Sequence, residues 1–411
     1  MPVSITKRAI SKVCIDEMTQ RAFGCEANSV EELTEGFFNI AYKVQVKDQT
    51  VILKVAPPMN VDIMTHEKNI MFSEVDAMRM VREQTDVPVP KILFYDDSKT
   101  ICDSAYFFME ELKGCSFSSS AEQYSEEEKA NIFRQVGSLT KKLSQIKGSA
   151  FGYYCQKDKQ GKNWYEVFRS MIEDTYEDAK RKEIIRPVGK EKLLALLSND
   201  RELFEEVKEP RFVHWDIWAG NVFVKDKEVV GIIDFERCLW ADELMEVGFR
   251  TYGYEQGFFE GYEIKQLTRS QLRRAKWYDI YLFLIVSLEC DYRQYDTKDA
   301  YHWACDMLMK WVTEMEKNTE DEGMIDTRCG LRCEGCEWKE PCNCGGCVAT
   351  NGNPFHGQCP VAVCCQDKGL VHCGECLDFP CDLLSQYSSD PEHGDNPPGA
   401  RIEQCRKWAQ Q

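Results

Sequence analysis

The sequence contains no long hydrophobic run and no cluster of basic residues. Its longest apolar stretch, residues 281–288, is far shorter than the roughly 20 residues that cross a bilayer as a helix. The formal net charge is −18, whereas nucleic-acid binding needs clustered Lys and Arg to neutralise phosphates. The N-terminal segment MPVSITKRAISKVCIDEM has no apolar run of signal-peptide length. We therefore expect a soluble, cytoplasmic protein with no membrane or nucleic-acid partner.

Internal repeats and low-complexity tracts are also absent, which excludes a repeat array. A hydrophobic content of 43% and an aromatic content of 11% are typical of a globular protein. A chain of 411 residues is longer than one hydrophobic core usually supports, so we expect two or three folded units. The acidic surface either attracts a cationic substrate or keeps the protein soluble, and we favour the second explanation.

Cysteine is distributed unevenly along the chain. Eight of the 21 cysteines are scattered between Cys14 and Cys305, whereas thirteen fall between Cys329 and Cys405. In a chain without a secretion signal, such density indicates metal binding before disulfides. The C-terminal segment is therefore a candidate metal-binding domain.

The pattern of hydrophobic residues divides the chain into three parts. Short apolar runs and turn signals over residues 30–112 predict a small β-rich lobe, which we extend to residues 1–112. Residues 113–317 are mostly helical in pattern, with long amphipathic stretches such as 124–146 and 268–289. Residues 316–328 are polar and predict a linker. Residues 318–411 thus form the linker and the cysteine-rich domain.

The stretch RFVHWDIWAGNVFVKDKEVVGIIDFE (211–236) contains two strand-like runs separated by a polar turn. If these runs pair as a hairpin with its turn centred between residues 227 and 228, Asn221 and Asp234 lie opposite one another. Opposed residues in an antiparallel ladder point to the same face with Cβ atoms about 5 Å apart. Amide and carboxylate oxygens on such a frame suit Mg²⁺ carrying a nucleotide phosphate.

Asp216 lies five residues before Asn221, on the preceding loop. This D-x-x-x-x-N spacing lets one loop supply both a carboxylate that orients a hydroxyl and a metal ligand, as in kinase catalytic loops. Asp216 would accept the proton of the acceptor hydroxyl and aim its oxygen at the γ-phosphorus of ATP. The alternative is a loop of surface carboxylates beside a structural hairpin, since short motifs also match by chance.

Two charged residues in apolar surroundings weigh against that alternative. Lys54 lies in the strand-like run VILKVA, on the face opposite its apolar neighbours. Glu74 lies in the apolar stripe of a predicted helix over residues 67–82. A carboxylate in such a stripe is costly unless it is paired. We expect Lys54 to be its partner, which gives the Lys–Glu pair that positions the phosphates of ATP in kinases.

The remaining nucleotide contacts are assigned from their order in the chain. A segment at the distance expected of a hairpin that covers the phosphates precedes the Lys54 strand, namely LTEGFFNIAYKV (33–44). It contains only one glycine, Gly36, and not the three of a G-x-G-x-x-G motif. YFFMEELKG (106–114) predicts a strand crossing between lobes, where backbone groups near Glu110 and Leu112 could bond adenine. His214 is assigned a structural role.

Taken together, HWDIWAGN, IIDFE, LTEGFFNIAYKV, the strand lysine and VPVPKIL (87–93) resemble the aminoglycoside phosphotransferase and choline kinase superfamily over about residues 30–317. The resemblance implies an α+β, bilobal, kinase-like fold, ATP and Mg²⁺, and phosphorylation of a small-molecule hydroxyl. By position, it implies that Asp216 is catalytic, that Asn221 and Asp234 bind metal, and that Glu236 is a second acidic residue of the site.

The helical part from residue 246 to 314 resembles the region of that superfamily that lines the acceptor pocket. Acidic residues of this part and its neighbourhood, such as Glu243, Glu289 and Asp291, could contact a cationic acceptor, although a solvated helix face is the simpler explanation. The acceptor class is left open between aminoglycoside-, choline- and homoserine-like molecules. Trp215 in place of the usual arginine, and the absence of A-P-E after Asp234, disfavour a regulated protein kinase.

The cysteine-rich segment, with CGLRCEGC, CGGC, CPVAVC and HCGECLDFPC, resembles an uncharacterised prokaryotic cysteine-rich domain family over about residues 326–384. C-x₂-C pairs have the reach to chelate tetrahedral ions, with zinc as the default and an iron–sulfur cluster as the alternative. The expected ligands are Cys329, Cys333, Cys336, Cys344, Cys347, Cys359, Cys364, Cys373, Cys376 and Cys381. Cys342, Cys365 and Cys405 are not assigned as ligands.

Two hypotheses follow. The first is an ATP-dependent small-molecule kinase with a structural or sensing metal module. The second is a catalytically silent nucleotide-binding or metal-sensing protein that acts through its cysteine-rich tail. The presence of Lys54, Glu74, Asp216, Asn221 and Asp234 favours the enzyme, since a decayed kinase usually lacks one of them.

Overall fold

The computed structural model describes residues 4–34, 36, 38–321, 325, 327–333, 336, 339–391 and 393–409. The chain forms two compact units. The first comprises Met1–Gln266 and Arg274–Trp311, and the second comprises Leu267–Arg273 and Val312–Gln411. The domain boundaries predicted from the sequence remain predictions.

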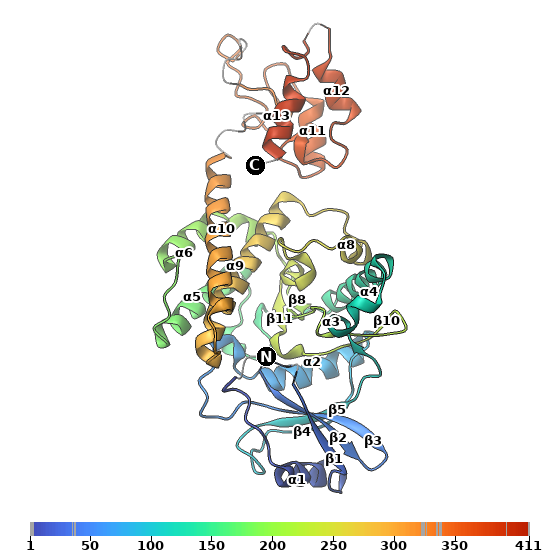
Figure 1. Ribbon diagram of the computed structural model, residues 1–411. Coiled ribbons are helices and arrows are strands. Elements are labelled where there is room, and N and C mark those ends of the chain that lie inside the picture. Colours follow the sequence, from blue (N-terminus) through green and yellow to red (C-terminus); the bar gives the residue numbers. More distant parts are fainter. Residues whose placement is uncertain are drawn as a thin grey trace. The chain divides into compact units, whose positions relative to one another are not determined.

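The first unit begins with a five-stranded antiparallel sheet in the order β1-β2-β3-β5-β4. Its elements are α1 (Lys12–Phe23), β1 (Ser29–Leu33), β2 (Ile40–Val46), β3 (Gln49–Val55), η1 (Thr65–Glu67), α2 (Ile70–Gln84), β4 (Ile92–Asp96) and β5 (Tyr106–Glu110). Helices α1 and α2 lie on opposite sides of this sheet (Figure 1).

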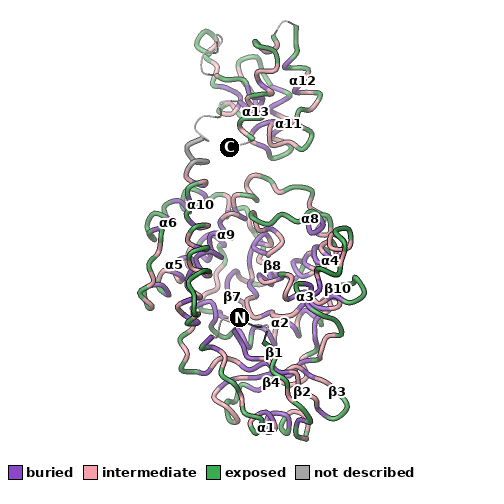
Figure 2. Tube along the Cα trace, viewed as in Figure 1, coloured by how far each residue is buried: buried purple, intermediate pink, exposed green. Residues whose placement is uncertain are grey.

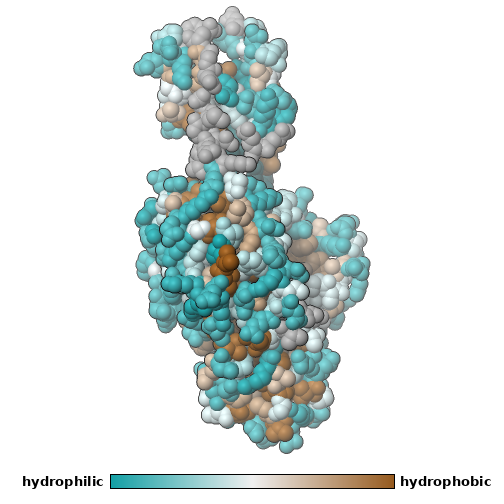
Figure 3. All heavy atoms as spheres, turned by 60° about the vertical axis from the view of Figure 1, so that its left-hand side comes forward, coloured by the Kyte–Doolittle hydropathy of each residue, from teal (hydrophilic) through white to brown (hydrophobic). Residues whose placement is uncertain are grey.

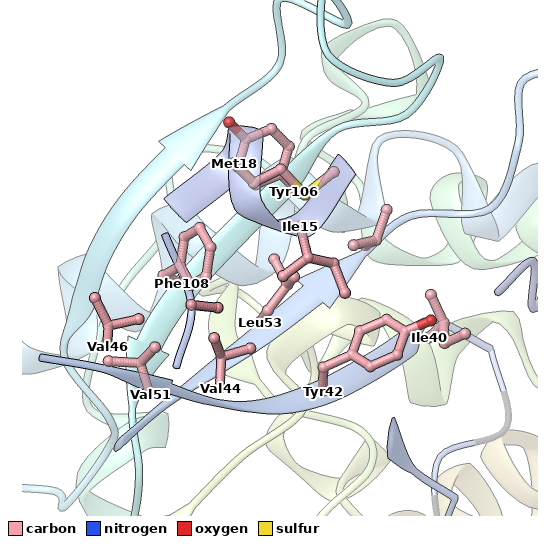
Figure 4. Close-up of a cluster of buried hydrophobic side chains, with 12 residues drawn as sticks. Ile15, Met18, Ile40, Tyr42, Val44, Val46, Val51, Leu53, Tyr106 and Phe108 are labelled. Atoms are coloured by element: carbon pink, nitrogen blue, oxygen red, sulfur yellow. The ribbon is translucent and has the colours of Figure 1, made fainter. Parts of the chain in front are cut away.

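Alternation along the strands determines what each face of the sheet covers. Val51, Leu53 and Val55 of β3 point to one face and pack in a buried cluster with Ile15 and Met18 of α1 (Figure 4). Because side chains alternate along a strand, Lys54 points to the other face. A buried lysine is thereby directed toward α2 and away from the α1 core.

The second lobe of this unit is mainly helical. It contains β6 (Cys115–Ser116), α3 (Phe117–Ser120), η2 (Ala121–Gln123), α4 (Glu126–Ser144), β7 (Gly152–Tyr153), η3 (Lys157–Lys159), α5 (Trp164–Arg181), α6 (Lys190–Asn199), α7 (Arg201–Glu205), β8 (Arg211–Val213), β9 (Val222–Lys225), β10 (Glu228–Ile232), η4 (Phe235–Arg237), β11 (Leu239–Ala241), η5 (Glu243–Met245), η6 (Val247–Phe249) and α8 (Gln256–Tyr262). It also contains most of α9 (Arg269–Arg293) and the first part of α10 (Asp299–Asp321), whose remaining residues belong to the second unit. The mixed α+β, bilobal fold predicted from the sequence is confirmed.

Local sequence signals explain the main helices of this lobe. Ser125 and Glu128 form a capping box that begins α4, so that two amides of its first turn are satisfied. Helix α9 is buried along most of its length (Figure 2), as expected of a central helix with apolar residues all round. Helix α10 continues to Asp321, so the first part of the predicted linker is helical.

Two small sheets hold the loops between the helices. One has the order β10-β9-β6 and the other β7-β11-β8. The β8–β9 connection and the segment after β10 emerge from these sheets, and they carry the predicted catalytic and metal-binding residues. Short strands thus position the loops of the site.

The second unit contains α11 (Pro360–Asp367), η8 (Cys373–Glu375), α12 (Asp382–Ser388) and α13 (Ala400–Ala409). Its core combines a few aliphatic side chains with buried thiols. The buried members are Cys329, Cys347, Cys359, Val361, Ala362, Cys365, Leu370, Cys373, Leu384 and Cys405.

The face drawn in Figure 3 is mostly hydrophilic, with hydrophobic residues in small patches. Among the helices that the structure describes, none combines the length and the apolarity needed to cross a bilayer.

Helices α4 and α8 approach closely because glycines lie at their contact. A Cβ atom on Gly137 of α4 would stand 2.1 Å from the carbonyl oxygen of Phe258, and one on Gly261 of α8 would stand 1.9 Å from that of Arg134. Backbone atoms cannot move aside as a flexible side chain can. The two helices must therefore separate if either glycine gains a side chain.

We predict that Gly137→Ala lowers the free energy of unfolding by about 1–3 kcal/mol, because it overpacks the α4–α8 contact. The measurement is urea unfolding of the full chain. Gly253→Ala is the matched control, since a Cβ there meets no atom within 4 Å. Equal stability of the two variants would contradict the close packing of α4 and α8.

Candidate active site

The loop that carries Asp216 is held in place by buried hydrogen bonds. The carboxylate of Glu246 accepts bonds from the backbone amides of His214 (2.9 Å) and Trp215 (3.2 Å). Trp215 has a φ of 66°, a left-handed conformation that costs free energy in a non-glycine residue. The loop therefore turns sharply just before Asp216.

His214 links this loop to the segment that carries Asp234. Its Nε2 lies 3.0 Å from the carbonyl oxygen of Ile233, and its Nδ1 accepts a bond from the Asp216 amide at 3.2 Å. The second bond requires the neutral ring with the proton on Nε2. Burial lowers the pKa of His214 to about 4, so the ring is neutral. These contacts agree with the structural role expected of His214.

Asp216 and Asn221 are joined directly. The Asn221 amide nitrogen donates to the backbone oxygen of Asp216 (2.9 Å) and to its carboxylate (3.0 Å). This fixes the orientation of the Asn221 side chain and leaves its Oδ1 available as an acceptor. Burial raises the pKa of Asp216 to about 6, although Arg237 and Arg250 act in the opposite direction.

The predicted register of the hairpin is wrong by one residue. Lys225 pairs with Glu228, so the turn is centred between Asp226 and Lys227, which both have positive φ, as a type I′ turn requires. A bulge between Val229 and Gly231 then shifts the ladder. The amide of Ile233, not Asp234, therefore bonds to Asn221, at 3.1 Å.

Asp234 leaves the ladder in a left-handed conformation with a φ of 65°. It does not oppose Asn221, yet both residues line the same cleft. The structure thus brings the two predicted metal ligands to one cavity by a route different from the expected one.

Lys54 connects the sheet, α2 and the end of β10. Its ammonium lies 2.6 Å from Glu74 and also forms an ion pair with Asp234. Glu74 is fully buried, so the predicted Lys54–Glu74 pair is confirmed. Burial alone would lower the pKa of Lys54, but the carboxylates of Asp234 and Glu74 outweigh it and raise the pKa above its usual value.

Negative charge accumulates beside this pair. Glu236 accepts a bond from the Asn39 amide nitrogen at 2.7 Å. Burial, together with the charges of Asp234 and Glu74, raises the pKa of Glu236 to about 8. Glu236 therefore holds a proton at neutral pH unless a cation offsets its neighbours. A site with several oxygen donors and carboxyl groups fits a hard divalent cation such as Mg²⁺. The donor set of Asn221, Asp234 and Glu236 therefore suits the ion that the sequence predicts.

All the predicted nucleotide and catalytic residues other than Glu74 line one cleft of about 1210 Å³. Gly36, between β1 and β2, lies on one wall, and the residues on either side of it are outside the described part of the chain. Glu110 and Leu112 lie on another wall. The amide of Glu110 bonds to Lys91, whereas the backbone groups of Leu112 have no partner within the described residues.

The opposite end of the cleft is lined by α9, α10 and the segment after η6. Of the three acidic candidates for contact with an acceptor, only Glu289 lines it. Glu289 pairs with Arg237 at 2.9 Å and with Arg293 at 3.2 Å. Glu243 accepts a bond from a tyrosine hydroxyl, and Asp291 pairs with a lysine.

Three lining residues that our sequence reasoning missed are Asn39, Arg237 and Arg250. Arg237 follows IIDFE directly, so its position beside the metal aspartate was the available signal. Asn39 and Arg250 carry no such signal, because their partners are distant in the sequence.

No disulfide joins the described cysteines of the second unit. Cys365 Sγ and Cys373 Sγ lie 3.5 Å apart, and Cys376 Sγ accepts from Lys368 at 3.1 Å. Of the expected ligands, Cys329, Cys347, Cys359 and Cys373 are buried, and Cys333, Cys336, Cys344, Cys364, Cys376 and Cys381 are half-buried. Within the described residues, no group of three or more Cys, His, Asp or Glu side chains is placed to hold a metal ion. Zinc binding by these thiols therefore stays a prediction.

The fold and the cleft define a kinase-like phosphotransferase. Residues 29–270 match the model of the phosphotransferase enzyme family APH. The chain belongs to this family, which confirms the resemblance of its first part. Residues 304–386 match a second family model, described as a protein of unknown function (DUF3795). This match confirms the resemblance of the cysteine-rich segment and begins earlier than expected, within α10.

Solved structures show the same fold for the first part. A Haemophilus somnus 129PT protein predicted to be a fructosamine-3-kinase is 17% identical with a TM-score of 0.55, over 72% of this chain and 96% of its own. The streptomycin–ATP complex of APH(2")-IIa is 17% identical with a TM-score of 0.51, over 75% and 97%. A thermostable mutant of APH(4)-Ia with AMP-PNP and hygromycin B is 16% identical with a TM-score of 0.55, over 73% and 98%. No curated protein matches.

We predict that Lys54→Met destabilises the chain by about 3–5 kcal/mol, because it leaves the buried Glu74 carboxylate without its partner. Glu74→Met should cost less, because Lys54 keeps its ion pair with Asp234. The double variant is expected to lose less than the sum of the two, since its remaining charge is that of Asp234 alone. Chemical unfolding of the four proteins gives this double-mutant cycle.

The control cycle uses Lys12→Met and Asp16→Asn on α1, an ion pair at the surface with 50% and 20% exposure. Its two effects should be small and additive. Additive effects at Lys54 and Glu74 would show that their ion pair contributes nothing to folding.

Proposed function

We propose that the chain transfers the γ-phosphate of ATP to a hydroxyl group of a small molecule, with Asp216 as the catalytic base and Mg²⁺ held by Asn221 and Asp234. The oxygen of the acceptor hydroxyl forms a bond to the γ-phosphorus, and the bond from this phosphorus to the β,γ-bridging oxygen breaks. ADP leaves with the bonding electrons, and the hydroxyl proton passes to Asp216.

The observation that carries the proposal is that Lys54 bonds to both Glu74 and Asp234 in the cleft that Asp216 and Asn221 also line. These residues come from segments up to 180 positions apart. A cluster of surface carboxylates would not need a buried lysine between them. Family membership supports the same assignment.

Asp216 is suited to accept a proton at near-neutral pH. Its carboxylate is held by the Asn221 amide at 3.0 Å, so it can be aimed at one position in the cleft. Because phosphoryl transfer is largely dissociative, the main contribution of such a base is to orient the nucleophile. His214 and Glu246 act by fixing the loop on which Asp216 lies.

The nucleotide would occupy the part of the cleft between Gly36, Lys54 and Leu112. The unpaired backbone groups of Leu112 are suited to the edge of adenine, and the ammonium of Lys54 to the α- and β-phosphates. Bound Mg²⁺ would neutralise phosphate charge during transfer. Asn221 and Asp234 would supply oxygen donors for it, and Glu236 lines the same cleft.

The rival function is a silent nucleotide-binding or metal-sensing protein that acts through the second unit. It retains the cleft and ATP binding but transfers no phosphate. The two functions differ in a single observable, which is acceptor-dependent release of ADP.

We predict that Asp216→Asn lowers acceptor-dependent ADP release by about 10²–10⁴-fold, the usual contribution of a general base. ATP affinity, measured by calorimetry, should change little, because Asp216 does not lie between the proposed nucleotide contacts. The enzyme assay requires a screen of hydroxylated metabolites to find a turned-over acceptor.

Asp226→Asn is the matched control. It makes the same substitution in the exposed turn of the adjoining hairpin, where Asn tolerates a φ of 52°. Full turnover in Asp216→Asn would remove Asp216 from the mechanism. ATP binding by the wild-type chain without turnover of any acceptor would favour the rival function.

Metal binding by the second unit stays a prediction, with zinc as the expected ion and an iron–sulfur cluster as the alternative. If the thiols ligate metal, the chain purified without oxygen should carry zinc by elemental analysis, or iron with visible absorbance. Cys329→Ser should lose metal, and Cys115→Ser, an exposed cysteine of the first unit, should not. A metal-free, folded chain with reactive thiols would exclude both ions.

A further inference from the structure

The charges at the acceptor end of the cleft are largely balanced by one another. Arg237 and Arg293 share Glu289, and Arg293 also bonds to Glu67 at 3.0 Å. Two guanidinium groups thus face two carboxylates. Another lining carboxylate, Asp299, is exposed in the first turn of α10, where the helix dipole stabilises its charge. This end offers little to an acceptor with several ammonium groups.

The charge of Arg250 is not neutralised by such an ion pair. Arg250 lines the cleft, is half-buried, and its guanidinium group donates to the Tyr252 hydroxyl and, over 3.5 Å, to the carbonyl oxygen of Trp215. In the part of the chain that the structure describes, no carboxylate lies within ion-pair distance of it. Its guanidinium group therefore keeps donors that can bind a ligand.

Asp216, Glu246 and Asp279 act electrostatically on Arg250, and each already accepts hydrogen bonds from other groups, Asp216 from the Asn221 amide. Glu246 accepts from the amides of His214, Trp215 and Val247. Asp279 accepts from the amide (2.9 Å) and the hydroxyl (2.6 Å) of Thr251. Their charges offset that of Arg250 at a distance, but they do not occupy its donors.

An aromatic wall lies beside Arg250. Tyr252 and Trp303 line the cleft with 36% and 44% of their surface exposed. Each packs against Phe283 with ring centroids 5.5 Å apart. Large aromatic surfaces left open to a cleft are suited to a planar or apolar ligand body.

We propose, on the basis of the proposed function, that the acceptor is a hydroxylated oxyanion with a planar or apolar body. Its carboxylate or phosphate binds Arg250, its body packs on Tyr252 and Trp303, and its hydroxyl meets Asp216. A guanidinium group suits both oxyanions, since its forked donors match their geometry. A polycationic acceptor would place an ammonium group beside Arg250, where like charges repel.

The test is a screen of acceptors in pairs that share one skeleton and differ in charge. Each hydroxy acid is paired with its amino alcohol, and each sugar phosphate with the free sugar. ADP release is measured with the full chain. We expect turnover of anionic members at least about tenfold above that of their partners, since a hydrogen bond to a charged group is worth 10- to 100-fold in affinity. The pairs also separate carboxylate from phosphate as the preferred oxyanion.

Variants of Arg250 distinguish contact with the acceptor from a general electrostatic effect on Asp216. If Arg250 binds the oxyanion, Arg250→Met should raise the KM of anionic acceptors about 10- to 100-fold and leave the KM of ATP unchanged. Arg250→Lys should recover part of the loss, because it keeps the charge without the fork. A uniform fall in kcat for all acceptors would contradict a direct contact between Arg250 and the oxyanion of the acceptor.

Arg134→Met is the control, since Arg134 is an exposed arginine of α4 paired with Glu260. Thermal unfolding checks that each variant folds. Preference of the wild type for cationic or neutral members would overturn the oxyanion acceptor and leave the kinase function standing. Turnover of no member, despite ATP binding, would overturn the kinase function and this inference with it.

Discussion

A buried lysine between two carboxylates determines how this cleft is built. Lys54 lies on a strand of the small sheet, Glu74 on α2, and Asp234 at the end of β10 in the second lobe. None of these charges can be left alone inside a protein, because the loss of hydration must be offset by a partner. The β3 strand, α2 and the segment after β10 must therefore meet at one point. The position of the groups that we propose to bind phosphate and metal follows from that requirement.

The same requirement explains why part of the site could be predicted. Lys54 interrupts an apolar strand and Glu74 interrupts an apolar helix stripe, so each residue is unfavourable where the local pattern places it. An ion pair between the two residues removes the cost of both buried charges, so we expect them to pair. The sequence thus identified a contact across 20 positions from local patterns alone, and it identified the kinase-like fold from the order of the motifs.

The hairpin shows where local patterns fail. Strand-like runs and a polar turn were visible in the sequence, but register depends on which two residues adopt positive φ and on where a bulge falls. Asp226 and Lys227 form the turn without glycine, and the bulge at Val229 and Gly231 leaves no compositional mark beyond one glycine. A Cβ at Gly231 would also lie 2.2 Å from the end of the Leu112 side chain, so this glycine has a packing role as well. Local signals therefore cannot fix the register.

The acceptor end was the hardest part to predict, because its charges are paired across long sequence distances. Glu289 appeared available to a cation until its partner Arg237, 52 positions away, was known. The nucleotide end, by contrast, follows the family motifs closely. The proposed ATP contacts are set by the chemistry of one donor, whereas no family motif assigns the residues of the walls from α9, α10 and the segment after η6. The charge balance of those walls, rather than the family motifs, is therefore the physical basis for assigning an acceptor to this chain.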